Sequence, residues 1–211
     1  MAADTLRPDE PTFGPSDPGG AGKPGAIIMA RHGEPDISRR LKLCAAEYAA
    51  WWARYEETGL RQGQEPPERL LRAVEGAAAL FASSRIRAIE TARAVAAGRV
   101  FEVDETLIEA PLPPPLLPSW LRFSPRTWGV IARFWWFFNH HHGQETRPQA
   151  EVRAAAVAER LELEAGAGGD VVVLAHGYFN HMIGRSLKRR GWRLVEDHGF
   201  HYWSLRRFER V

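Results

Sequence analysis

Two histidines end short apolar segments in nearly the same setting. One stands in the sequence Arg-His-Gly at 31–33, directly after the apolar segment 26–30, and the other, His176, directly follows the apolar segment 171–175. Short apolar segments bounded by turn residues are typical of buried parallel strands. The carboxyl ends of such strands meet at one edge of the sheet, where α/β proteins bind ligands. Two imidazoles and a guanidinium at that edge would suit a phosphoryl group.

The residue types agree with phosphoryl chemistry. A phosphate monoester is a dianion, and its transfer depends on positioning and on stabilising the charge of the equatorial oxygens. The guanidinium of Arg31 can bind two such oxygens at once. A neutral imidazole at His32 can attack phosphorus and form a phosphohistidine, provided that its other ring nitrogen holds the proton through a carbonyl or carboxylate. We expect Gly33 to let the backbone turn sharply and approach the ligand.

Length and composition indicate one ordinary globular domain. The chain has 211 residues and a formal net charge of +2, which gives no bulk field directed at nucleic acid, so no nucleic-acid partner is expected. The lone Cys44 excludes an internal disulfide and a cysteine metal cluster. Residues 1–25 are rich in proline and glycine and predict a disordered tail before a domain at 26–211. No apolar run is long enough to span a membrane, so we expect a cytoplasmic protein.

Apolar periodicity and turn residues predict alternating strands and helices. This alternation predicts an α/β fold, a three-layer α/β/α sandwich with a mostly parallel central sheet. Ser83 and Ser84 are expected to cap the helix that follows them. We expect helices at 41–60, 66–75, 87–97, 127–138, 148–165 and 179–190, and strands at 26–30, 77–82, 100–108 and 171–175, with two short strands between 192 and 206.

A proline-rich and aromatic insertion, approximately 111–143, is expected to lie over the active-site edge of the sheet. Its helix is apolar on nearly every side, so something must cover it. The first explanation is core packing against the helix that carries Trp51 and Trp52. The others are a lid over the substrate, a homodimer interface, and contact with a membrane surface.

Three motifs occur in a fixed order, each at a predicted strand end or helix start. They are Arg-His-Gly at 31–33, Ser-Ser-Arg-Ile-Arg-Ala-Ile-Glu-Thr-Ala at 83–92, and Ala-His-Gly at 175–177. The combination closely resembles the histidine phosphatase superfamily, also called the phosphoglycerate mutase-like family, from about residue 26 to the C-terminus. The resemblance implies that His32 is the nucleophile, that Arg31 and Arg87 bind phosphate, and that His176 is a further ligand. Simpler alternatives are an Arg87–Glu90 pair and Arg85 as the phosphate ligand, although the alignment favours Arg87 and leaves Arg85 a surface charge.

The leaving oxygen needs a proton, so a carboxylic acid should stand near the phosphate. In the family, this acid often lies in a Leu-x-Glu pattern after a strand, which Glu109 matches. The sequence after Glu109 departs from the mutases, because alanine and proline replace their glycine- and tryptophan-containing stretch. The competing carboxylates are Glu34, Asp36 and Glu145.

The resemblance implies a phosphoric monoester hydrolase that needs neither metal nor other cofactor and acts on a phosphorylated small molecule or phosphoprotein. The consecutive histidines 140–142 cannot all face one ion, and we expect a solvated loop there. The alternative functions are a phosphoglycerate-type mutase and a non-catalytic module that binds a phosphorylated ligand or phosphoprotein.

Overall fold

The computed structural model of the protein describes residues 23–210, so nearly all of the expected N-terminal tail lies outside the described residues. Six strands form one sheet in the order β3-β2-β4-β1-β6-β5. Strands β1, β2, β3 and β4 run parallel to one another, whereas β6 is antiparallel to both of its neighbours, β1 and β5. The strands are β1 (Ile27–Arg31), β2 (Ala77–Ser83), β3 (Glu102–Asp104), β4 (Asp170–Ala175), β5 (Trp192–Asp197) and β6 (Leu205–Arg210).

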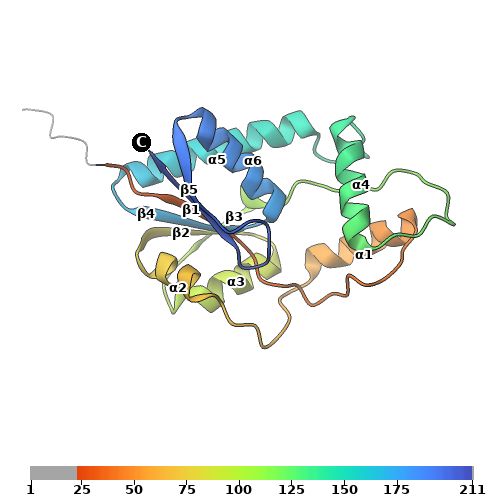
Figure 1. Cartoon of the computed structure of the whole chain (residues 1–211), viewed down its shortest axis with the longest axis horizontal. Helices are drawn as coiled ribbons and strands as arrows, with labels where there is room; N and C mark the ends of the chain where they lie inside the picture. Colours follow the sequence, from red (N-terminus) through yellow and green to blue (C-terminus); the bar gives the residue numbers. More distant parts are fainter. Residues whose placement is uncertain (1–22, 211) are drawn as a thin grey trace, which may run out of the picture.

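Helices cover both faces of this sheet, which confirms the three-layer sandwich (Figure 1). Alternate residues of β1 point to opposite faces, as a strand requires: Ile27 and Met29 pack with α5 and α6, and Ile28 and Ala30 pack with α2 and α3. The helices are α1 (Ala45–Glu57), α2 (Glu68–Glu75), α3 (Ile86–Ala96), α4 (Pro125–Phe137), α5 (Arg147–Gly166) and α6 (Gly177–Arg189).

Two local expectations are wrong. The predicted strand 100–108 is a strand only over Glu102–Asp104 and continues as a 3-10 turn, because the Asp104 side chain accepts a hydrogen bond from the backbone of Thr106. No serine side chain caps α3, whose N-cap residue is Arg85. Ser83 is instead hydrogen-bonded to His176 in the interior.

The insertion is built on α4, which crosses α1 at one end of the molecule (Figure 1). Trp128 and Ala132 of α4 pack with Tyr48 and Trp51 of α1 in a hydrophobic cluster separate from the two clusters of the sandwich. The core-packing explanation is therefore confirmed for this face of α4. Much of the rest of the helix is not covered by residues 23–210, and its exposed apolar side chains are Val130, Phe134, Trp135 and Phe137, followed by Phe138. No helix of the described part of the chain is long and apolar enough to cross a membrane.

Candidate active site

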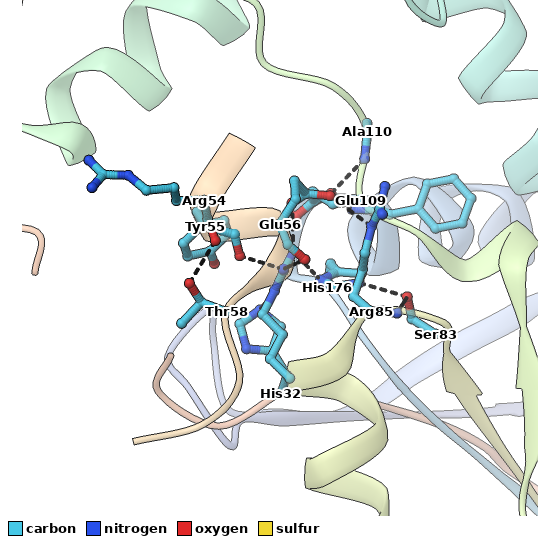
Figure 2. A network of polar contacts seen from close by, with 12 residues as sticks. His32, Arg54, Tyr55, Glu56, Thr58, Ser83, Arg85, Glu109, Ala110 and His176 are labelled. Carbon is cyan, nitrogen blue, oxygen red and sulfur yellow. Dashed lines mark hydrogen bonds and ion pairs between the residues drawn. The ribbon is translucent and has the colours of Figure 1, made fainter. Parts of the chain in front are cut away.

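His32 and His176 meet at the carboxyl edge of the sheet. Strands β1 and β4 are parallel neighbours, and Arg31 is paired in register with Ala175, so the next residue of each strand reaches the same level. The two imidazole rings have their centroids 5.2 Å apart, and each residue is only 1% exposed. The expectation that both histidines converge on one point is confirmed (Figure 2).

The His32 ring is arranged as a nucleophile would need. Its Nδ1 lies 2.7 Å from the carbonyl oxygen of Gly33. A carbonyl can only accept, so Nδ1 carries the proton and Nε2 keeps a lone pair. Burial, with Arg87 and Arg31 nearby, holds the pKa of His32 well below its ordinary value. The ring is therefore neutral at neutral pH.

His176 is held in the opposite tautomer. Its Nδ1 lies 3.4 Å from a terminal nitrogen of Arg87, which can only donate, so Nδ1 accepts. Nε2 then carries the proton and donates to the Ser83 hydroxyl at 2.8 Å. Burial and the charge of Arg87 also lower the pKa of His176. Both rings thus present lone pairs toward one guanidinium.

Arg87 lies between the two histidines and is fully buried. Its Nε donates to Nε2 of His32 at 3.3 Å, and one terminal nitrogen donates to the backbone carbonyls of both Tyr55 and Glu56. The Glu56 carboxylate accepts from the other terminal nitrogen at 2.8 Å, and its second oxygen pairs with Arg85 at 2.8 Å (Figure 2). An internal carboxylate therefore neutralises the charge of Arg87.

The structure contradicts one alternative for Arg87 and one expectation for Arg85. Arg87 pairs with Glu56 and not with Glu90, whose carboxylate instead accepts from the backbone of Leu60. Arg85 is not a free surface charge, since its side chain is 36% exposed and ion-paired to Glu56. The sequence analysis did not single out Glu56. It is separated from the three motifs, and only the fold brings the end of α1 to them.

Arg31 borders a cavity of about 370 Å³ next to the histidines. One terminal nitrogen of Arg31 donates to the Phe200 carbonyl, and its guanidinium lies 4.4 Å from the centre of the Tyr202 ring. Its buried Nε has no hydrogen-bond partner among the described residues. His32 and His176 do not line the cavity, which is bordered by Arg31, Arg39, Trp52, Tyr55, Glu109, Leu112, Arg126, Gly129, Val130, Arg133, Gly177, Tyr178 and Phe200.

Glu109 borders this cavity, and its carboxylate is fixed by backbone groups. It accepts hydrogen bonds from the amides of Tyr178 and Phe179, in the first turn of α6, at 3.2 and 2.8 Å, and from the amide of Ala110 at 3.0 Å. A helix N-terminus stabilises an anion in this position. Glu109 thus lines the same cavity as Arg31 and Gly177.

The three competing carboxylates lie elsewhere. Glu34 pairs with Arg61 at 3.1 Å, and Asp36 is exposed on the loop that follows β1. Glu145 forms a two-pronged pair with Arg153, each contact being 2.7 Å, and Arg153 also binds the carbonyl of Ile108, the residue before Glu109. Glu145 therefore supports the segment that carries Glu109.

Neighbouring residues of the motifs hold the site in place. A Cβ atom at Gly33 would lie 2.4 Å from the Trp203 ring, so this packing requires a glycine here. The Gly33 amide donates to the Thr91 hydroxyl at 3.0 Å, and this hydroxyl donates to the carbonyl of Arg87. Thr91 thereby connects the loop that carries His32 to the helix that carries Arg87.

The histidines 140–142 lie in the loop after α4. His140 contacts the carbonyl of Pro114 at 3.1 Å, and its ring centroid is 4.3 Å from that of His142. Within residues 23–210, no group of three or more His, Cys, Asp or Glu side chains is arranged to hold a metal ion.

Comparison with known proteins identifies the family. A sequence profile of the histidine phosphatase superfamily (branch 1) matches residues 27–210. No protein in the curated set matches the chain. The chain belongs to the histidine phosphatase superfamily, branch 1, as its three ordered motifs predict.

Solved structures with the same fold are distant in sequence. A phosphoserine phosphatase variant from Entamoeba histolytica, solved with phosphoserine, is 15% identical with a TM-score of 0.51, over 78% of this chain and 80% of that one. A mycobacterial glucosyl-3-phosphoglycerate phosphatase is 22% identical with a TM-score of 0.51, over 78% and 82%. The YhfR protein of Bacillus stearothermophilus is 19% identical with a TM-score of 0.52, over 78% and 80%. At these identities the likeness establishes the fold.

Proposed function

We propose that the protein is a metal-independent phosphoric monoester hydrolase that works through a phosphohistidine on His32. The observation that carries this proposal is the pair of neutral imidazoles around the buried Arg87, with the cavity bordered by Arg31 beside them. Membership of a superfamily that includes phosphatases supports it, as does the fold shared with solved phosphatases. The substrate is a phosphorylated small molecule or phosphoprotein.

In the first step, the substrate phosphate replaces the Glu56 carboxylate on Arg87 and also binds Arg31. Arg87 Nε releases the lone pair of His32 Nε2, and His176 turns its Nε2 proton from the Ser83 hydroxyl to a phosphate oxygen. Nε2 of His32 then attacks phosphorus, so that a phosphorus–nitrogen bond forms while the bond to the leaving oxygen breaks. Arginines and donated hydrogen bonds stabilise the charge on the equatorial oxygens in the transition state. The Gly33 carbonyl holds the proton of Nδ1 and stabilises the charge that develops on the ring.

Glu109 acts in its protonated form, which the phosphate dianion bound nearby favours over the carboxylate, and transfers this proton to the leaving oxygen in this first step. In the second step its carboxylate takes a proton from a water molecule, whose oxygen attacks phosphorus and breaks the bond to His32. Inorganic phosphate leaves, His32 is neutral again, and Glu109 has recovered its proton. Its position at the cavity wall beside Arg31 supports this role over those of Glu34, Asp36 and Glu145.

The direct test is hydrolysis of p-nitrophenyl phosphate by the purified protein in the presence of EDTA. We expect release of phosphate by the wild type and none by His32→Ala, because the covalent intermediate cannot form. His142→Ala, at an exposed histidine of the insertion loop, is the matched control and should keep full activity. Full activity in His32→Ala would disprove the mechanism.

Two other functions remain as alternatives. A phosphoglycerate-type mutase must protect its phosphohistidine from water, and isomerisation of 3-phosphoglycerate would reveal one. A non-catalytic binding module needs no nucleophile in line with phosphorus, and tight binding of a phosphopeptide without turnover would support it. The neutral His32 with its lone pair toward the site favours the hydrolase over the binding module.

A further inference from the structure

Four arginines line the cavity without a carboxylate partner. Twelve arginines of the described chain have a side-chain nitrogen within 4.0 Å of a carboxylate oxygen. Arg31, Arg39, Arg126 and Arg133 have none among residues 23–210, and Glu109 is the one carboxylate of this part of the chain that lines the cavity. The cavity therefore carries an excess of positive charge.

Arg133 shows this excess most clearly. Its guanidinium donates to the carbonyls of Ala110 and Pro111 at 3.1 and 3.3 Å and lies 3.8 Å from the centre of the Tyr178 ring. These partners are uncharged, and burial lowers the pKa of Arg133 although Glu109 opposes this effect. A buried cation is costly unless an anion accompanies it.

Arg39 and Arg126 extend this positive wall. The Nε of Arg39 is buried without a partner in the described residues, while one terminal nitrogen donates to the Tyr202 hydroxyl at 2.8 Å. Arg126 precedes Arg133 by two turns of α4, and both line the cavity together with Val130 between them. Residues spaced in this way lie on one face of a helix.

One phosphoryl group does not use all of these charges. Arg31 is the arginine that continues directly into His32, so it belongs to the phosphoryl end of the cavity. Arg39 shares the Tyr202 side chain with Arg31 and so lies at the same end, which leaves Arg126 and Arg133 of α4 for another anion. Between the charges, the walls are apolar or aromatic, and these side chains are Trp52, Tyr55, Leu112, Val130, Tyr178 and Phe200. A volume of about 370 Å³ accommodates a small organic molecule.

We propose that the cavity is a binding site for a second anionic group of the substrate, held by Arg126 and Arg133. The substrate class is then a phosphate monoester with an apolar or aromatic body that carries an acid group at the end away from the phosphate. This inference rests on the proposed hydrolase function, and its test separates the two.

The test compares three aryl phosphate esters that differ in the group opposite the phosphate. Phenyl phosphate lacks a second group, 4-carbamoylphenyl phosphate carries a neutral one, and 4-carboxyphenyl phosphate carries an anion. We expect kcat/KM for the carboxy ester to exceed that for the carbamoyl ester by about tenfold or more, since hydrogen bonds to a charged group are worth this much. Equal values for these two esters would overturn the proposal while leaving the hydrolase intact.

Variants assign the effect to the arginines. Arg126→Gln and Arg133→Gln should each lower the ratio of kcat/KM for the carboxy ester to kcat/KM for the carbamoyl ester to near one. Arg122→Gln is the matched control, because Arg122 belongs to the same insertion but pairs with Glu47 and does not line the cavity. A preference that survives in both cavity variants would contradict the assignment. Arg126 is exposed, so its variant tests the proposal even where Arg133→Gln fails to fold.

A binding measurement tests the anion site independently of whether the protein hydrolyses the esters. Calorimetry with His32→Ala gives dissociation constants for the three esters whether or not the wild type hydrolyses them. Tighter binding of the carboxy ester, lost in a His32→Ala, Arg126→Gln double variant, supports the anion site even if the hydrolase proposal fails. The same dissociation constant for the carboxy and carbamoyl esters would contradict it.

Discussion

The two sides of the site are built on different principles. On the sheet side, the polar groups of His32, His176 and Arg87 are bonded to one another or to nearby protein groups, and all three residues are buried. On the insertion side, the two arginines of α4 that line the cavity have no carboxylate partner among residues 23–210. The first arrangement resists movement, whereas the second leaves charge for a ligand to satisfy.

This difference suggests a division of labour. A network in which each group positions the next is suited to one reaction geometry, because bond formation depends on small errors in position. A cavity with unpaired charge and apolar walls is suited to choosing among substrates. The sheet side should therefore control kcat, and the insertion side should control KM and specificity.

The largest expected contrast is between Arg87→Gln and Arg126→Gln. Loss of Arg87 removes the charge between the two imidazoles, and we expect kcat to fall by roughly 10³-fold or more, as for other arginines that stabilise transferring phosphoryl groups. Arg126→Gln should raise KM for 4-carboxyphenyl phosphate by about tenfold and leave kcat nearly unchanged. Steady-state kinetics with p-nitrophenyl phosphate and 4-carboxyphenyl phosphate measure both. Similar losses of kcat in both variants would contradict the division between the two sides.

Next in size is the effect of Glu109→Gln, which removes the proposed proton donor. We expect kcat to fall by about 10²- to 10⁴-fold for poor leaving groups, with a changed shape of the pH–rate profile. Glu145→Gln is the matched control. It should lower the melting temperature through the broken pair with Arg153 and keep the shape of the pH profile. An altered profile in Glu145→Gln and not in Glu109→Gln would reassign the proton donor.

The pH dependence of stability tests the buried histidines. Burial lowers the pKa of both rings, so below pH 6.5 the unfolded chain binds protons that the folded chain does not. Stability therefore falls as the pH drops below about 6.5, by up to about 1.4 kcal/mol per pH unit for each histidine. Urea unfolding at pH 7.5 and pH 5.5 measures this, and the decrease should be smaller in His32→Asn and in His176→Asn. An equal decrease in all three proteins would mean that other groups cause it.

The smallest expected effect concerns Glu56, which occupies Arg87 in the absence of substrate. Glu56→Gln removes the competing charge, so inorganic phosphate should inhibit the variant about tenfold more strongly than the wild type. The inhibition constant of phosphate against p-nitrophenyl phosphate gives the answer. Weaker inhibition in the variant would show that Glu56 holds Arg87 in position rather than competing with the ligand.

Local patterns in the sequence predicted most of the fold. The apolar segments 26–30 and 171–175 form strands β1 and β4. The helix after β4 was expected to begin at residue 179 and begins at Gly177. The error over 100–108 arose because Asp104 stabilises a turn with its side chain, which a count of apolar residues does not register. His32 and His176 meet because two buried strands pair in parallel. The apolar segments that precede the two histidines were enough to predict this arrangement.

What the sequence by itself determined is the set of candidate reacting groups. These residues each belong to a short motif at the end of a strand or the start of a helix, and they are Arg31, His32, Arg87, His176 and Glu109. Only the tertiary structure decided that the Glu56 carboxylate pairs with Arg87. It also decided that two arginines of α4 line the cavity while aromatic side chains of the same helix stay exposed. The physical reason is that an ion pair between distant elements depends on how helices pack across one another. Packing of this kind is set by the combined shapes of α1 and α4, which no local pattern of residues encodes.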